Sequence, residues 1–187
     1  MPIGLFGKLP ARGDFVSHGL PPALLRQWEN WLAAVTPAAR GGADPIPIGW
    51  DNGPVLRFWI GSDQPGGARA GVFRPSQDRV GRRFPFTLVW HGDAPDAPLA
   101  PVLPDAHQAG PWYDALAAAA ERLCDEGFAG EPADLIASLP EPPASGQEAA
   151  PRAAFFAEGV TGSATLFDDV AGHDHALAAA GRSYWWA

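Results

Sequence analysis

Two stretches of the sequence place apolar residues at helical spacing, and short apolar segments of strand length surround them. After Pro21 and Pro22, which can open a helix at its first turn, apolar residues recur every three or four positions as far as Val35. The stretch 111–128 repeats this spacing. Strand-like segments mixed with two amphipathic helices predict an α/β or α+β sheet domain.

The expected strands are short, and two of them flank a polar turn. The segments with strand character are Ile3–Gly7, Val55–Ile60, Ala70–Phe73, Phe84–His91, Ala153–Ala157 and Ser163–Phe167, with an apolar end at Ser183–Trp186. Because R-P-S-Q-D-R-V-G-R-R separates the third from the fourth, we expect a hairpin there. A shorter helix is expected at 134–139. The Pro- and Ala-rich segment at about 140–152 has too little apolar content to pack, so we expect it to be a flexible surface loop within one domain, 1–187.

Charge and cysteine content restrict the class of partner and the compartment. The formal net charge of -8 at pH 7 argues against general nucleic-acid binding, which needs basic surface. No run of about 18 apolar residues is present, so we expect no membrane insertion. The beginning of the chain lacks the basic region of a signal peptide, and Cys124 is the one cysteine. Together these features predict a cytoplasmic protein.

The charge is distributed unevenly along the chain. Residues 1–92 carry 10 Lys and Arg against 6 Asp and Glu, whereas residues 93–187 carry 3 against 15. Apart from Lys8, every basic residue is an arginine, which offers planar, bidentate hydrogen bonding to carboxylate or phosphate. A GC-rich genome is an alternative source of this arginine content.

The segment Gly7–Phe15 (G-K-L-P-A-R-G-D-F) has the composition of a structured turn. Its lysine precedes the turn and no Ser or Thr follows it, so it is not a phosphate loop of the Walker type. It is either a surface loop that presents Arg12 and Asp14, or a strand-to-helix connection in which Asp14 hydrogen-bonds locally.

The segment Arg74–Pro85 contains four arginines within ten residues. Arginines at this density bind an anionic surface or pair internally. Asp78 is able to neutralise one of them, and Gly81 permits a positive φ and hence a tight loop. The alternative interpretation is an ordinary solvated hairpin tip.

Nothing in the sequence makes a positive case for catalysis. The segment His173–His175, with Asp168 and Asp169 nearby, lacks a third histidine close in sequence, and a metal site needs a full ligand set. No G-x-S-x-G motif occurs, and the carboxylates are scattered. We therefore expect no catalytic residue, no metal and no cofactor.

Four segments, in order, resemble one known family. These are GKLPARGDF, the helix with Trp28 and Trp31, PSQDRVGRRFPFT and the closing SYWW. They are similar to the TagF/ImpM family of type VI secretion-associated proteins. The resemblance implies a single-domain α/β sheet with helices on both faces, as in a three-layer sandwich. It further implies a cytoplasmic, post-translational repressor without assigned catalytic activity, which engages a scaffold protein with a forkhead-associated domain.

Our expectation is a non-enzymatic repressor of type VI secretion that binds a cytoplasmic component of the apparatus. An outward-facing tryptophan at the end of the chain joins the loop residues as a contact candidate, because aromatic residues are favoured at interface centres. The expected contact residues are Arg12, Asp14, Arg79, Arg82, Arg83 and Trp186. The residues expected to build the loops are Gly7, Pro10, Gly13, Pro75, Ser76, Asp78, Gly81 and Pro85. Two alternatives stay open: the arginines pair with acids inside the fold, or they clamp a small anion or phosphate in a sensor or enzyme.

Overall fold

A computed structural model describes residues 3–35, 53–60, 69–92, 106–142 and 183–186. Within these ranges six strands form one sheet in the order β2-β1-β5-β4-β3-β6, and every neighbouring pair is antiparallel. The strands are β1 Ile3–Lys8, β2 Phe15–His18, β3 Leu56–Ile60, β4 Arg69–Arg74, β5 Phe86–His91 and β6 Ser183–Trp186. The helices are α1 Pro22–Val35, α2 Ala106–Leu123 and α3 Pro132–Ala137.

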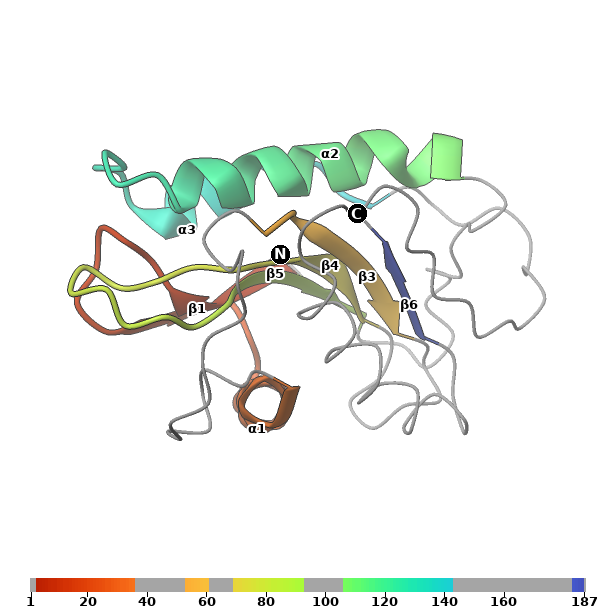
Figure 1. Cartoon of the computed structure of the whole chain (residues 1–187). Helices are drawn as coiled ribbons and strands as arrows, with labels where there is room; N and C mark the ends of the chain where they lie inside the picture. The colour runs from red at the N-terminus through yellow and green to blue at the C-terminus, as the bar shows by residue number, and fades with distance from the viewer. Residues whose placement is uncertain (1–2, 36–52, 61–68, 93–105, 143–182, 187) are drawn as a thin grey trace.

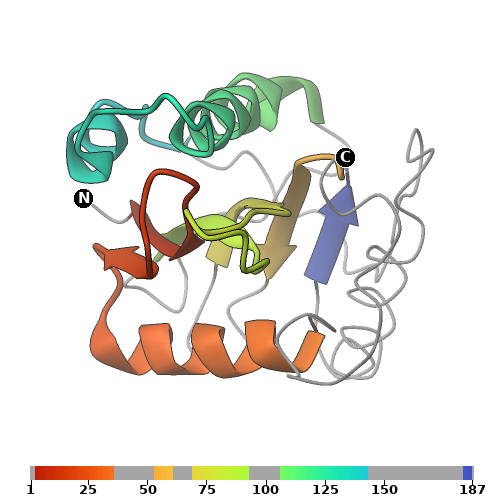
Figure 2. The ribbon, with the colours of Figure 1, turned by 60° about the vertical axis from the view of Figure 1, so that its left-hand side comes forward.

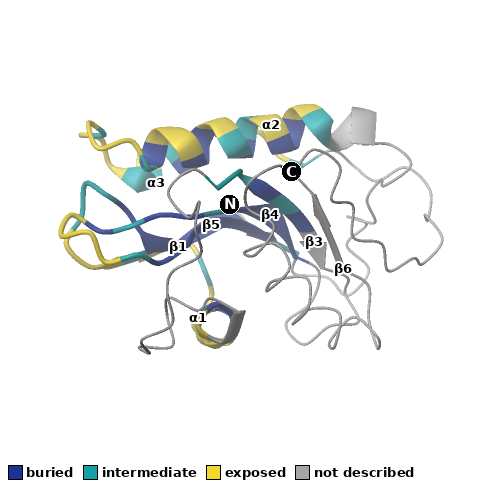
Figure 3. Cartoon of the chain, viewed as in Figure 1, coloured by how far each residue is buried: buried dark blue, intermediate teal, exposed yellow. Residues whose placement is uncertain are grey.

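Helices cover both faces of this sheet. Figure 1 shows α1 on one face and α2 with α3 on the other, and Figure 3 shows the buried sheet between them. Successive residues of a strand point to opposite faces, so Leu5 and Leu88 pack toward α2 while Phe6 and Val89 pack toward α1. The predicted α/β fold with helices on both faces is confirmed.

The core on the α2 face is built from alternate strand residues and the apolar stripes of two helices. The buried members are Ile3, Leu5, Leu9, Ala70, Val72, Phe86, Leu88, Trp90, Trp112, Tyr113, Leu116, Ala119, Ala120, Leu123, Ile136 and Leu139. On the outer side of the layer, the Arg57 guanidinium donates to Asp114 Oδ1 at 2.6 Å and links β3 to α2. Burial on both sides of β1, β4 and β5 holds the loops that follow these strands on a rigid support.

The core on the α1 face is rich in aromatic residues. Its buried members are Phe6, Trp28, Leu32, Leu56, Phe58, Phe73, Phe84 and Val89. The Trp28 indole N–H donates to Thr87 Oγ1 at 2.9 Å, and the Thr87 hydroxyl donates to the carbonyl oxygen of Phe6 at 3.0 Å. This pair of bonds satisfies the buried Trp28 indole and Thr87 hydroxyl and fixes α1 against β1 and β5.

The predicted elements that fall within the described residues are present, with one additional strand and different bounds for two helices. Helix α3, expected at 134–139, runs from Pro132 to Ala137. The hairpin of β4 and β5 is confirmed by their antiparallel pairing. Strand β2 was not expected, because it has only four residues and three of them are exposed, so it lacks the apolar pattern of a strand. Helix α2 begins at Ala106 rather than Pro111, and it ends at Leu123 rather than Phe128.

Several expectations lie outside the described residues. These are the strands at 153–157 and 163–167, most of the surface loop at about 140–152, and the histidine and aspartate residues at 168–175. Of the helices that the structure describes, none is long and apolar enough to span a membrane.

Candidate functional site

The two sequence motifs meet at one end of the sheet. The β1–β2 loop (residues 9–14) and the β4–β5 loop (residues 75–85) lie side by side there (Figures 1 and 2). The backbone N–H of Arg79 donates to the carbonyl oxygen of Arg12 at 2.8 Å. The Ser76 hydroxyl donates to the Lys8 carbonyl at 2.8 Å, and the Arg82 guanidinium donates to the Gly13 carbonyl at 2.7 Å. Residues about 70 positions apart in the chain therefore form a single structure, which we call the loop pair.

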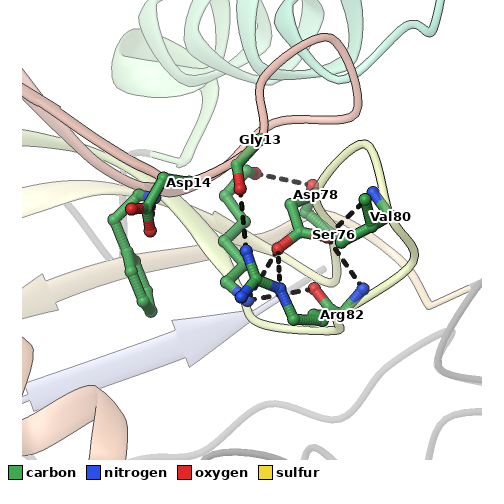
Figure 4. Close-up of polar contacts among 8 residues, drawn as sticks. Gly13, Asp14, Ser76, Asp78, Val80 and Arg82 are labelled. Carbon is green, nitrogen blue, oxygen red and sulfur yellow. Dashed lines mark hydrogen bonds and ion pairs between the residues drawn. The ribbon is translucent and has the colours of Figure 1, made fainter.

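The buried carboxylate of Asp78 is the centre of the loop pair (Figure 4). Its Oδ2 lies 3.0 Å from Lys8 Nζ and accepts a hydrogen bond of 2.7 Å from Arg82 Nε. Its Oδ1 accepts hydrogen bonds from the backbone N–H groups of Val80 at 3.1 Å and Arg82 at 2.9 Å. The side chains of Asp78 and Lys8 are 0% and 8% exposed, so this ion pair is withdrawn from water.

These contacts hold Asp78 in its ionised form. Burial by itself raises the pKa of a carboxyl group. The backbone N–H of Arg82, the Lys8 ammonium, the Arg82 guanidinium and the Val80 N–H outweigh this effect and place the pKa of Asp78 well below its usual range. The carboxylate is therefore a permanent structural anion at neutral pH and is not available as a general base.

The local sequence explains why the β4–β5 loop folds this way. The Gly81 N–H donates to the Asp78 carbonyl at 2.9 Å, which closes a turn with an aspartate at its first position. Gly81 has φ 82, a left-handed conformation that glycine adopts without a steric penalty. Below the turn, Gln77 and Arg83 form an antiparallel bridge, and the Phe84 N–H donates to the Ser76 carbonyl at 3.0 Å.

A second close approach lies where β1 meets the end of the β4–β5 loop. Gly7 has φ 140, and a Cβ atom at this position would overlap the carbonyl oxygen of Pro85. Only a glycine lets the two backbones come this near. This contact sets the position of both loops relative to the sheet.

The expected contact residues occupy different environments. Arg79 is exposed, and among the described residues no hydrogen bond or ion pair engages its guanidinium. Arg82 is committed to Asp78 and Gly13 although its side chain is 59% exposed. Arg83 is half-buried and has further contacts within the protein.

The β1–β2 loop makes its own contacts with the segment before α3. Arg12 pairs with the exposed Glu131 at 3.3 Å, a solvent-screened contact of small energetic value. Asp14 accepts a hydrogen bond from the neighbouring Phe15 N–H at 2.8 Å, and it is otherwise exposed. The β1–β2 loop connects two strands, and not a strand and a helix.

Trp186, the last expected contact residue, lies in β6 and pairs through its backbone with Arg57 of β3. The structure does not describe the Trp186 side chain.

Three residues of this site were not among the expected site residues. Lys8 is the chain's one lysine and the one charge within an apolar strand, which was a usable signal. Val80 is the one aliphatic residue between Pro75 and Arg83, also a usable signal. Phe15 gave no such signal, because aromatic residues are common after turns.

A small cavity of about 150 Å³ lies behind the β4–β5 loop. Its lining includes Arg74, Ser76, Gln77 and Cys124. Burial raises the pKa of the Cys124 thiol, while the nearby Arg74 and the Ser76 hydroxyl act in the opposite direction. Since the thiolate is the reactive form, this thiol is poorly suited to nucleophilic chemistry.

The described ranges contain no group of three or more His, Cys, Asp or Glu residues that is able to hold a metal ion. In the loop pair, Asp78 pairs with cations on the inside, whereas Arg79 and Val80 are exposed on the outside.

The comparison with protein families decides where the chain belongs. Residues 4–137 match the TagF N-terminal domain, described as type VI secretion system-associated. The chain belongs to this family. The match contains both loops of the loop pair, α1, α2 and α3. The resemblance seen in the motifs is thereby confirmed, and the protein is associated with the type VI secretion system.

A solved structure shares the fold. The crystal structure of PA0076 from Pseudomonas aeruginosa PAO1 has 29% sequence identity to the chain and a TM-score of 0.64. The similarity covers 99% of this chain and 81% of that one. No curated protein matches the chain.

Proposed function

We propose that this TagF-family protein is a non-enzymatic, cytoplasmic regulator that represses type VI secretion after translation by binding a component of the apparatus. The observation that carries the proposal is the family match over residues 4–137, which includes both loops of the loop pair. On the strength of the family resemblance, a scaffold protein with a forkhead-associated domain is our first candidate for the component.

The geometry of the loop pair supports binding over catalysis. Asp78 accepts four hydrogen bonds or ionic contacts, from Lys8, Arg82 and two backbone N–H groups. A general base needs a free, titrating carboxylate near the operating pH, and this one is saturated. Arg79 and Val80 are exposed on the outer side of the loop pair, where a partner protein is able to reach them.

The same contacts weigh against a phosphate clamp, the rival function. A clamp requires several guanidinium groups that converge on one anion. Arg82 instead directs its Nε at Asp78 and one terminal nitrogen at the Gly13 carbonyl. We expect inorganic phosphate and nucleotides to leave the melting temperature of the protein unchanged. A saturable rise in that temperature favours the anion-binding function instead.

Deletion of the gene in its native host tests the proposed function. Type VI secretion is measured together with the abundance of the apparatus proteins. We expect secretion to rise while the abundance of these proteins stays the same, because repression acts after translation. Secretion that is unchanged or lower in the deletion strain contradicts the proposal. Binding of the purified full chain to the purified scaffold protein then tests the named partner.

A further inference from the structure

The loop pair carries an unusual exposure of apolar side chains. Among the described residues, only two large apolar side chains are exposed, Val80 at 68% and Phe15 at 46%. Both lie on or directly beside the two loops that Arg82 joins through Asp78 and Gly13. Within the described residues, large apolar side chains are therefore exposed at the loop pair and nowhere else, and a localised exposure of this kind is typical of interaction sites.

Neither exposure is needed for the fold. The Val80 side chain belongs to neither apolar core, and the turn uses only its backbone N–H, which donates to Asp78. The Phe15 ring stacks on Phe6 with centroids 5.6 Å apart and contacts Phe84 edge-on at 4.8 Å, and nearly half of the residue remains uncovered. A polar residue at position 80 would serve the turn equally well.

The exposed groups are held rigidly in place. Asp78 fixes the backbone on both sides of Val80, and the Arg79 N–H is bonded to the Arg12 carbonyl. The Lys8 ammonium lies 5.0 Å from the centre of the Phe15 ring and supports it from the buried side. A surface that is ordered before binding loses little conformational entropy in the complex.

The charge of the loop pair indicates the chemistry of what it binds. The segments 7–15 and 74–85 carry six Lys and Arg against two Asp, in a chain whose net charge is -8. Two of these charges, Lys8 and Asp78, neutralise each other internally. The Arg79 guanidinium has no hydrogen-bond or ion-pair partner among the described residues, and much of Arg82 is exposed. Carboxylates of a partner complement this surface.

We propose that Phe15 and Val80 are the apolar anchors, and Arg79 the free cation, of a docking surface for a protein that presents carboxylates around an apolar pocket. This inference rests on the proposed function, since it describes how the regulator engages its partner. A protein suits the surface better than an anionic membrane does, because Asp14 and Glu131 lie at the same end as the cations. An extended anionic membrane meets both signs of charge, whereas a protein is able to place its carboxylates at Arg79 and away from Asp14 and Glu131.

Photo-crosslinking in the native host tests this surface. A photoreactive phenylalanine analogue replaces Val80 in the full chain, and the same analogue replaces the exposed Gln27 of α1 as the control. We expect an adduct from position 80 and none from position 27, attached to a segment where Asp or Glu residues adjoin apolar ones. The absence of an adduct from position 80, or attachment to a basic segment, overturns the inference.

The identity of the captured protein separates this inference from the proposed function. A cytoplasmic component of the secretion apparatus, captured from position 80, supports both. An acidic, apolar segment of a protein unrelated to secretion supports the docking surface and counts against the proposed function. A secretion component captured only from position 27 supports the function and overturns the surface.

Affinity measurements with the captured protein quantify the contribution of each anchor. Val80→Ser and Arg79→Gln should each weaken binding by about tenfold or more, with unchanged melting temperatures. The matched control Arg26→Gln removes another exposed arginine, on α1, and should change affinity by less than about twofold. Equal affinities for all three variants overturn the inference. Binding of the wild-type chain to phosphatidylglycerol vesicles that is lost in Val80→Ser overturns it in favour of a membrane surface.

Discussion

The inner and outer parts of the loop pair differ although Asp78 and Arg82 of the inner part flank Arg79 and Val80 of the outer part in one turn of the β4–β5 loop. On the inside, the Asp78 carboxylate pairs with Lys8 and Arg82 and accepts hydrogen bonds from backbone N–H groups. On the outside, Arg79 and Val80 are exposed on the turn that these contacts hold in place. The comparison teaches that a dense group of arginines is not one functional unit. Position relative to Asp78 decides whether an arginine supports the loop or is displayed by it.

Removal of the inner carboxylate should have the largest effect. Asp78→Asn leaves the Lys8 ammonium buried without a counter-charge, and breaking a buried ion pair on one side costs about 3–5 kcal/mol. Equilibrium unfolding in denaturant measures this loss. Asp134→Asn on α3 is the control, because that carboxylate is exposed. A loss below about 1 kcal/mol would show that the inner part does not organise the loops.

The same carboxylate should make stability depend on pH in the acid range. The pKa of Asp78 is far below normal in the folded protein and near its usual value of about 3.9 in the unfolded chain. Its stabilisation is therefore fully present above about pH 5 and is lost as pH falls through the unfolded pKa toward the folded pKa. The difference in unfolding free energy between wild type and Asp78→Asn should narrow between about pH 5 and pH 2. A constant difference across this range contradicts the assignment.

The backbone approach at Gly7 should be the next most sensitive feature. Gly7→Ala places a Cβ against the Pro85 carbonyl in a backbone conformation that alanine disfavours, at a cost of about 1–3 kcal/mol. Gly110→Ala is a matched control, because it lies in α2 with open space around it. That control should stay within about 1 kcal/mol of wild type, because the helix preference of alanine is opposed by the following Pro111, which disfavours a Cβ on the residue before it. Thermal unfolding of both variants checks the contrast, and equal effects argue against it.

Replacing each of the two arginines of the turn should change the stability of the protein by different amounts. Arg82→Gln loses charge-assisted hydrogen bonds to Asp78 and Gly13, and after a discount for its exposure we expect a cost of about 1–2 kcal/mol. Arg79→Gln loses no side-chain hydrogen bond or ion pair among the described residues and should stay within about 0.5 kcal/mol of wild type. Parallel melts test this, and equal losses would remove the distinction between inner and outer arginines.

Much of the fold was predictable because its helices and strands follow from the spacing of apolar residues over short segments. The hairpin of β4 and β5 followed from two apolar segments around a polar turn, and α1 from its apolar spacing. Strand β2 was not predictable, because four mostly exposed residues become a strand only through pairing with β1.

The sequence predicted which two segments form the site. It did not predict which of their arginines support the loops and which are exposed. Both motifs were recognisable, but the pairing of Lys8 with Asp78 depends on the register of β1 against β5, in which Gly7 lies opposite Phe86. Long-range register is not encoded in either motif alone. Arg79 and Arg82 were therefore equally good candidates for contact residues in the sequence, and only the fold distinguishes them.

Secretion measured in the native host with an outer-surface variant tests the central claim most directly. The deletion strain is complemented with wild type, with the Arg79→Gln, Val80→Ser double variant, or with Arg26→Gln, each at matched cellular abundance and with its melting temperature determined. We predict that the double variant folds like wild type and fails to repress type VI secretion, while Arg26→Gln represses normally. Full repression by a stably folded double variant would contradict the account.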